Sequence, residues 1–327
     1  MTQPDFHSER DLAVSAVIEA AVICAAVQAE ISSEVLEKKD RSPVTVADFG
    51  SQAVICRLLA ERFPDDPVIA EEGSTELREG AGASLLPRVV DHLSRVVPGC
   101  SADDVCAWID HGGVTEYSER FWTLDPIDGT KGFLRRQQFA ISLGLIVRGE
   151  LTVAAVGCPK LGLGDEQGVV FSAVRGQGAT QQPLGRAGEP QSIAVSGESE
   201  PANIRFCESV ERGHSSHDDA ARIAERLGIV AAPVRLDSQT KYAVVARGDA
   251  EAYLRLPKSA EYQEKIWDHA GGALVVVEAG GRVSDIRGNP LDFTRGRTLE
   301  RNRGVIVSNG RVHDAILGAI SELEIGY

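Results

Sequence analysis

Two aspartates that lie three residues apart, Asp125 and Asp128, are the first residues in this sequence that could bind a metal. They follow the apolar residues 121–124 and bracket Pro126, which fixes the local backbone and has no N–H group to donate. Two carboxylates at the end of a buried strand repel each other unless a cation lies between them. Mg²⁺ prefers such oxygen ligands, including a backbone carbonyl such as that of Ile127. A magnesium site is therefore one of two interpretations of this segment.

Gly129 and Thr130 come directly after this pair. Near a turn or at the start of a helix, their backbone N–H groups could bind a phosphate. The alternative is a plain Asp-Gly turn in which an aspartate caps the backbone, because such turns are common. The segment alone leaves both interpretations open.

Three further acidic residues have ordinary alternatives to a role in chemistry. Glu72 ends another short apolar strand and could be a solvated acid. Asp268 could be the N-cap of the helix that follows, a role that is compatible with metal binding. Gly271 and Gly272 within that helix cost about 1 kcal/mol each relative to alanine, which indicates that something approaches the backbone closely there. Asp48 could be an exposed residue of its helix.

The periodicity of apolar residues predicts a layered α/β (α+β) architecture. Helices are expected over residues 11–36, 49–63, 85–97, 102–110, 218–227, 241–246 and 268–279. Strands are expected over residues 68–70, 121–124, 139–147, 151–157, 168–174, 205–209, 234–236 and 252–256. The runs between residues 121 and 174 are expected to form an antiparallel meander. A stretch rich in Gly, Gln and Pro suggests two halves, 1–185 and 186–327.

The composition bounds the class of protein. The net charge of −14 argues against a nucleic-acid polymer as partner, because such binding needs a basic surface. No run of about 18 apolar residues is recognised, so no transmembrane helix is expected, and the N-terminus lacks the pattern of a signal peptide. The six cysteines form no CxxC pair, so a reducing cytoplasm is the expected compartment.

In combination, the motifs resemble a known family. DPIDGT, WDHAGG, an upstream EE and the segment SPVTVAD resemble the lithium-sensitive phosphatase superfamily that includes inositol monophosphatase. The longer forms DPIDGTKGFLR, LDSQTKY, YLRLP and YQEKIWDHAG are similar to the 3′(2′),5′-bisphosphate nucleotidases of yeast and plants. The resemblance covers residues 11–308 and implies the sugar-phosphatase fold of that superfamily, with helix and sheet layers in the order αβαβα.

The resemblance also implies residue roles. The family's Mg²⁺ ligands match Glu72, Asp125, the carbonyl of Ile127, Asp128 and Asp268. Residues that match Asp48 and Thr130 activate the attacking water. The substrate-binding residues would be Gly129, Thr130, Lys131, His214, Ser238, Lys241 and Arg255. His217 is an alternative to His214, either histidine could be solvent-exposed, and Lys241 could be a surface lysine.

The implied activity is Mg²⁺-dependent hydrolysis of the 3′-phosphate of adenosine 3′,5′-bisphosphate, and of its sulfated analogue. Two or three Mg²⁺ ions per site, inhibition by Li⁺ and perhaps Na⁺, and a monomer or weak homo-oligomer without a membrane partner are expected. The alternatives are an inositol polyphosphate 1-phosphatase, a catalytically silent sensor of metal and nucleotide, and a glycosidase carboxylate pair.

Overall fold

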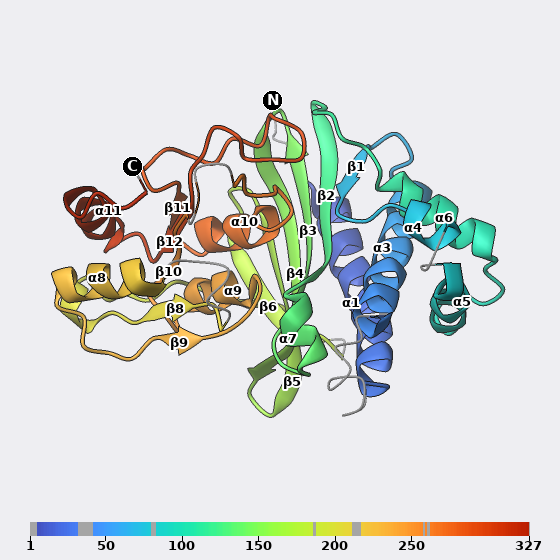
Figure 1. The fold of residues 1–327 in the computed structure, drawn as a ribbon, viewed down its shortest axis with the longest axis horizontal. Helices are drawn as coiled ribbons and strands as arrows, with labels where there is room; N and C mark the ends of the chain where they lie inside the picture. The colour runs from blue at the N-terminus through green and yellow to red at the C-terminus, as the bar shows by residue number, and fades with distance from the viewer. Residues whose placement is uncertain are drawn as a thin grey trace.

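The structure of the protein is a computed structural model, which describes residues 5–31, 42–79, 83–185, 188–210, 217–257, 259 and 262–326. Within these ranges, helices alternate with two sheets of seven and five strands in five layers (Figure 1). From right to left in Figure 1 the order is helix, sheet, helix, sheet, helix. The αβαβα layering expected from the sequence is therefore confirmed.

The first layer consists of two long helices, α1 (His7–Ala29) and α3 (Ser42–Arg62), which pack against each other. The sequence predicts that the second helix begins only near residue 49. Instead α3 begins at Ser42, because a proline is tolerated in the first turn of a helix, where its missing N–H has no partner to lose. Asp48 therefore lies in the second turn of α3. Three shorter helices follow, namely α4 (Thr75–Arg78), α5 (Leu86–Ser94) and α6 (Ala102–His111).

Helix α1 is apolar throughout much of its length. Among the described residues it is the one helix long and apolar enough to cross a membrane, with a window of mean hydropathy 2.0 that is 50% buried in the structure. The expectation that no apolar stretch of this length occurs is therefore wrong, and the expectation that no helix spans a membrane stays a prediction. Ala13, Val17 and Ala20 of α1 are fully buried, and the helix packs between α3 and the first sheet. This packing gives α1 the position of a core helix.

The first sheet contains the strands that lead to the acidic segments. Its strands follow one another in chain order, and all neighbouring pairs are antiparallel except the first, which is parallel. The strands are β1 (Val68–Ala70), β2 (Arg120–Asp128), β3 (Ala140–Val147), β4 (Glu150–Leu163), β5 (Glu166–Val174), β6 (Ala179–Pro183) and β7 (Gln191–Ser192). The predicted antiparallel meander is confirmed. Because β7 pairs with β6, the sheet extends past residue 185, and the division into two halves stays a prediction.

The second sheet has the strand order β11-β12-β10-β8-β9. Its strands are β8 (Phe206–Glu208), β9 (Val234–Arg235), β10 (Ala252–Arg255), β11 (Arg282–Ser284) and β12 (Val305–Ser308). The remaining helices are α7 (Thr130–Leu134), α8 (His217–Leu227), α9 (Thr240–Ala246), α10 (Ala270–Glu278) and α11 (His313–Glu322). Helices α9 and α10 lie between the sheets, and α8 and α11 form the outer layer (Figure 1). The sequence analysis did not predict β11, β12 and α11.

Candidate active site

The parallel pairing of β1 with β2 brings two acidic segments to one edge of the first sheet. Ala70, the last residue of β1, pairs with Leu124, so Glu71 and Asp125 are the residues that come next on the two strands. Side chains at paired positions of neighbouring strands point to the same face, and the following residue points to the other. The register therefore favours Glu71 over Glu72 as the neighbour of Asp125. The sequence analysis missed Glu71.

Asp125 and Asp128 are part of β2 rather than following it, and the register with β3 shifts between them. Asp125 is 2% exposed, and its Oδ1 has no hydrogen-bond partner among the described residues. A buried carboxylate oxygen without a donor is unfavourable unless a cation binds it. Asp128 Oδ2 accepts a hydrogen bond of 2.5 Å from the backbone N–H of Gln239. The donor set and the bare oxygen fit a Mg²⁺ site.

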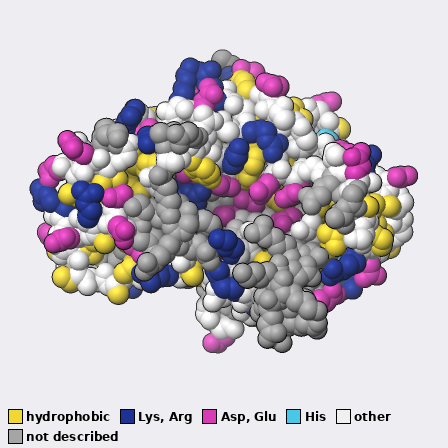
Figure 2. All heavy atoms as spheres, in the orientation of Figure 1, with side chains coloured by type: hydrophobic (Ala, Val, Ile, Leu, Met, Phe, Trp, Pro, Cys, Tyr) yellow, Lys and Arg dark blue, Asp and Glu magenta, His cyan; other side chains and the backbone are white. Residues whose placement is uncertain are grey.

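The carboxylates around Asp125 repel one another. Burial raises the pKa of Asp125 well above its ordinary range, and four neighbouring carboxylates raise it further. In decreasing order of effect these are Glu71, Asp128, Asp268 and Asp48. Burial and then the charge of Asp128 raise the pKa of Asp268 to about 6. Figure 2 shows acidic side chains gathered near the middle of one face, with basic side chains beside them.

Glu71 is the carboxylate that links β1 to this acidic cluster. Burial of its carboxyl raises the pKa of Glu71 to about 8, and the charges of Asp268, Glu72 and Asp128 add to the effect while Arg297 opposes it. Several carboxylates that repel one another at neutral pH are stabilised by cations bound between them.

Helix α3 supplies Asp48 and fixes both acidic segments. Asp48, Ser51 and Gln52 share one face of the helix because they are three and four residues apart. Ser51 Oγ donates to the carbonyl of Pro126 at 2.9 Å. Gln52 donates to the carbonyl of Glu72 at 2.8 Å and accepts from its N–H at 3.1 Å.

Asp48 is 6% exposed, so the alternative of an exposed helix residue is wrong. Burial and then the charge of Glu72 raise the pKa of Asp48. The sequence alone carries no signal for Ser51 or Gln52.

Asp268 precedes α10 by two residues, and His269 is the N-cap of that helix. The prediction that Asp268 caps α10 is therefore wrong. The backbone N–H of His269 and that of Ala270 both bind the carbonyl of Ile266, at 3.2 and 2.9 Å, and this turn places the cap one residue later. The Asp268 side chain is 24% exposed, and the charge of Asp128 acts on it.

Asp268 also lies in a polar group with Glu264 and His269, whose possible ligand atoms lie within 4.8 Å of one another. Arg255 already balances this group, because its Nη2 lies 3.0 Å from Glu264 Oε2 and 3.8 Å from Asp268 Oδ2. His269 bonds the Tyr242 hydroxyl through Nδ1 at 2.6 Å and Glu264 through Nε2 at 3.2 Å. The guanidinium lies nearer Glu264 than Asp268, so Glu264 binds Arg255 and Asp268 is the member of this group that can also serve the acidic cluster.

Three predicted substrate residues begin helix α7. Gly129 is its N-cap with a φ of 89°, a backbone conformation that favours glycine. Thr130 and Lys131 follow in the first turn, and both are exposed. His214 lies outside the described residues, as does the side chain of His217.

The other predicted substrate residues, Ser238, Lys241 and Arg255, line one cavity of about 20 Å³ together with Asp128 and Asp268. Lys241 is 3% exposed, so the surface-lysine alternative is wrong. Its Nζ donates to the carbonyl of Ser238 at 2.8 Å and lies 4.9 Å from the centre of the Tyr253 ring. Burial lowers the pKa of Lys241, and the charge of Asp128 opposes that shift. The structure therefore places two cations against the acidic cluster.

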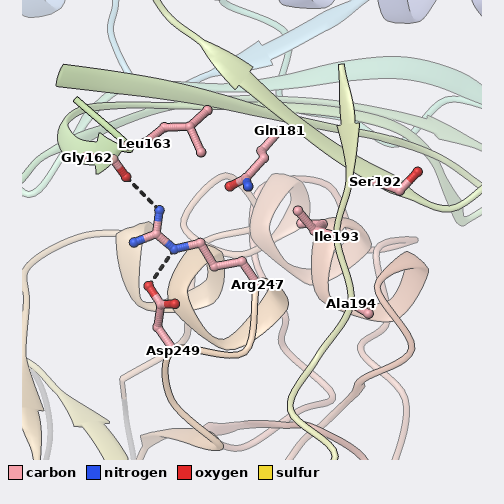
Figure 3. A pocket seen from close by; sticks show the side chains of 9 residues that line it. Gly162, Leu163, Gln181, Ser192, Ile193, Ala194, Arg247 and Asp249 are labelled. Atoms are coloured by element: carbon pink, nitrogen blue, oxygen red, sulfur yellow. Dashed lines mark hydrogen bonds and ion pairs between the residues drawn. The ribbon is translucent and has the colours of Figure 1, made fainter. Parts of the chain in front are cut away.

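A larger cavity, of about 460 Å³, lies between the β4–β5 turn, β6, the chain after β7, and the end of α9 (Figure 3). Arg247 points into it, but Nε of Arg247 donates to Asp249 at 2.5 Å and Nη1 donates to the carbonyl of Gly162 at 2.9 Å. This guanidinium is already paired with a carboxylate. This cavity therefore suits the binding of a multiply charged phosphate less well than the acidic cluster, where Lys241 and Arg255 lie.

The pKa values predict that the metal-free protein loses stability as the pH rises. Glu71 shifts from 4.5 to about 8 and Asp268 from 3.8 to about 6. The folded state therefore keeps protons that the unfolded chain releases between about pH 4 and pH 8, and stability falls through that window. We expect the increase in Tm on adding Mg²⁺, relative to EDTA, to be larger at about pH 8 than at about pH 5. An increase that is the same at both values would contradict the cluster.

The comparisons with known proteins identify the family of this chain. The sequence profile of the inositol monophosphatase family matches residues 7–324. The chain is 40% identical to a 3′(2′),5′-bisphosphate nucleotidase from Emericella nidulans, covering 97% of this chain and 99% of the relative. It is 42% identical to a protein of the same name from Schizosaccharomyces pombe, covering 96% and 95%.

Solved structures show the same fold. An inositol monophosphatase from Anabaena matches with a TM-score of 0.64 at 20% identity, covering 98% of this chain and 97% of that one. CysQ from Bacteroides thetaiotaomicron, a bacterial member of the inositol monophosphatase family, matches with a TM-score of 0.64 at 21% identity, covering 94% and 98%. This chain belongs to the inositol monophosphatase family, which implies a divalent metal such as Mg²⁺.

Proposed function

We propose that this chain is a Mg²⁺-dependent phosphomonoesterase that hydrolyses the 3′-phosphate of adenosine 3′,5′-bisphosphate to AMP and phosphate. The observation that carries the proposal is the similarity, over nearly the full length and at 40% and 42% identity, to two relatives named 3′(2′),5′-bisphosphate nucleotidase. The sulfated analogue, 3′-phosphoadenosine 5′-phosphosulfate, presents the same 3′-phosphate, so we include it among the substrates.

The residues that would hold the metal are Asp125, Asp128, Asp268, the carbonyl of Ile127, and a carboxylate from Glu71 or Glu72. Bound Mg²⁺ would lower the pKa of the attacking water and offset the negative charge of the phosphate oxygens.

Asp48 would accept a proton from the attacking water. Its pKa is raised by burial and by Glu72, which makes its carboxylate a better base near neutral pH. The exposed hydroxyl of Thr130, on a helix that contacts α3, would orient the same water. Hydrolysis by direct attack needs no covalent intermediate on the protein.

The substrate would bind between two groups of residues. The backbone N–H groups at Gly129, Thr130 and Lys131 would face the reacting phosphate. Ser238, Lys241, Arg255 and, beyond the described residues, His214 would contact the nucleotide and its second phosphate. A buried ammonium and guanidinium favour a substrate that keeps a phosphate after hydrolysis.

Replacing Lys241 by methionine should raise KM for the bisphosphate by about tenfold or more, because one charge-assisted hydrogen bond to the retained phosphate is lost. Adenosine 3′-monophosphate lacks that phosphate, so its KM should change little. Steady-state kinetics with both substrates checks this, and Lys160→Met, which removes a lysine that lines a different cavity, is the control. An equal increase in KM for both substrates would show that Lys241 does not contact the second phosphate.

Phosphate release from adenosine 3′,5′-bisphosphate, inositol 1-phosphate and inositol 1,4-bisphosphate, each with and without EDTA, tests the function. We expect the nucleotide to be preferred and EDTA to abolish turnover. Preference for inositol 1,4-bisphosphate would favour the inositol polyphosphate 1-phosphatase. Absence of turnover even in a single-turnover experiment would favour the sensor. Hydrolysis of a glycoside that persists in EDTA would favour the glycosidase.

We further propose inhibition by Li⁺, and by Na⁺ at higher concentration, because a small monovalent cation can occupy one of the two or three Mg²⁺ positions. A cytoplasmic location and a monomeric or weakly associating state are part of the same proposal.

A further inference from the structure

The side-chain amide of Gln239 lies at the junction of the elements that hold the acidic cluster. Gln239 is 1% exposed and precedes α9. Its Oε1 accepts hydrogen bonds from Ser142 Oγ on β3 at 3.1 Å and from the backbone N–H of Gly272 in α10 at 2.9 Å. Its Nε2 donates to the carbonyl of Trp267 at 2.9 Å. The amide thus bonds the backbone on both sides of Asp268, at Trp267 before α10 and at Gly272 within it.

Only one orientation of this amide satisfies its partners. Rotating it by 180° would place Nε2 against the N–H of Gly272 and Oε1 against the carbonyl of Trp267, so two donors and two acceptors would face each other. The backbone N–H of the same residue donates to Asp128 Oδ2. One residue therefore sets the position of the Asp128 carboxylate and of the turn that carries Asp268.

The surrounding packing leaves this junction little freedom. A Cβ added to Gly272 would lie 2.5 Å from Tyr242 Cγ on α9, and one added to Gly271 would overlap Ser142 Oγ. The close approach to the backbone that these glycines predict from the sequence is confirmed. The start of α10 can therefore lie directly on β3 and α9, where the amide of Gln239 reaches it.

We propose that Gln239 is a positioning residue for the metal site: it touches no reacting atom, and it fixes the separation between the Asp128 and Asp268 carboxylates. The inference rests on the proposed function only in taking these two carboxylates as metal ligands. Groups that hydrogen-bond a metal ligand directly are worth about 10- to 100-fold in metal affinity. The backbone N–H of Gln239 bonds Asp128 in this way, and its amide acts on Asp268 through the backbone of Trp267 and Gly272.

The test is Mn²⁺ binding to the full-length protein without substrate, followed by electron paramagnetic resonance. Gln239→Met keeps the shape of the side chain and removes the amide but not the backbone bond to Asp128, and its Kd for Mn²⁺ should rise about tenfold, the lower end of the range for direct partners of a ligand. The matched control is Asn309→Leu. The Asn309 side-chain amide is also buried, and it accepts hydrogen bonds from two backbone N–H groups and donates to two carbonyls. These partners lie outside the acidic cluster, at Ser196, Glu198, Arg311 and Val312. Both variants should lose thermal stability, and only Gln239→Met should lose metal affinity.

A milder variant covers the case in which Gln239→Met does not fold. Ser142→Ala removes one of the two donors to Oε1 and should raise the Kd about fivefold, the effect of one neutral hydrogen bond. Wild-type affinity in Ser142→Ala and in any folded Gln239→Met would overturn the inference while leaving the metal site in place. A wild-type protein that binds no Mn²⁺ would instead overturn the metal site, and the inference with it.

Discussion

Replacing Asp125 by asparagine should remove almost all activity and at the same time raise the Tm of the metal-free protein. The Asp125 carboxyl is buried, its Oδ1 has no partner among the described residues, and its pKa is raised by neighbouring carboxylates. Asparagine has the same shape without the charge, so repulsion falls when no metal is bound. With a ligand lost, kcat/KM should fall by about 10³-fold, which corresponds to several kcal/mol of transition-state stabilisation. Phosphate release in saturating Mg²⁺ and thermal unfolding in EDTA measure the two effects.

Asp66→Asn is the matched control for that experiment. Asp66 is also buried, but its carboxylate accepts hydrogen bonds from Arg120 Nε at 2.8 and 2.9 Å and from Trp122 Nε1 at 3.0 Å. Its replacement should lower the free energy of unfolding by about 1–3 kcal/mol and leave kcat/KM unchanged. If Asp125→Asn also lowered the Tm in EDTA, Asp125 would be a satisfied structural carboxylate and not part of a cation site.

The parts of the site that the sequence predicts are those whose physics is contained in a few neighbouring residues. Asp125 and Asp128 repel each other because they lie three residues apart, whatever the rest of the chain does. Gly271 and Gly272 reveal a close approach because a glycine pair inside a helix is otherwise unfavourable. Most of the helices and strands were likewise predicted from local periodicity, and the layered fold follows from their alternation.

The parts that were missed depend on contacts between distant segments. Gln239 and Asp128 are 111 residues apart, and no local pattern connects them. The buried state of Asp48 depends on how α3 packs, which the helix's own sequence does not fix. Strands β11 and β12 were missed although they are no shorter than β1 and β8, of three residues each, which were predicted, so length alone does not explain the miss. The position of Asp268 before α10, instead of at its N-cap, was set by a turn at Ile266 that leaves no clear sequence signal.

The choice between two adjacent glutamates shows most clearly how register decides function. From the sequence, Glu72 was chosen as the ligand from β1, on the basis of family resemblance. In the structure Ala70 pairs with Leu124, and Glu71 is the glutamate whose charge acts on Asp125 most strongly. Glu72 acts on Asp48 and on Glu71, and its backbone is held by Gln52. A shift of one residue along β1 would exchange the two roles.

We therefore expect Glu71→Gln and Glu72→Gln to differ sharply although the residues are neighbours. Glu71→Gln should raise the Mg²⁺ concentration for half-maximal activity and lower kcat/KM by about 10²–10³-fold, because a ligand to the metal is lost. Glu72→Gln should leave kcat/KM within about fivefold, the effect of one neutral hydrogen bond. Since the charge of Glu72 raises the pKa of Asp48, its removal should shift the acidic limb of the pH–kcat profile to lower pH.

Each glutamate variant is the control for the other, because the chemical change is the same and the positions are adjacent. Mg²⁺ titrations of activity and pH–kcat profiles of both variants, with Tm measured to confirm folding, distinguish the roles. The reverse pattern, in which Glu72→Gln loses metal affinity and Glu71→Gln keeps it, would restore Glu72 as the ligand. It would also mean that the edge of β1 beyond Ala70 turns its side chains opposite to the direction that the β1–β2 register implies.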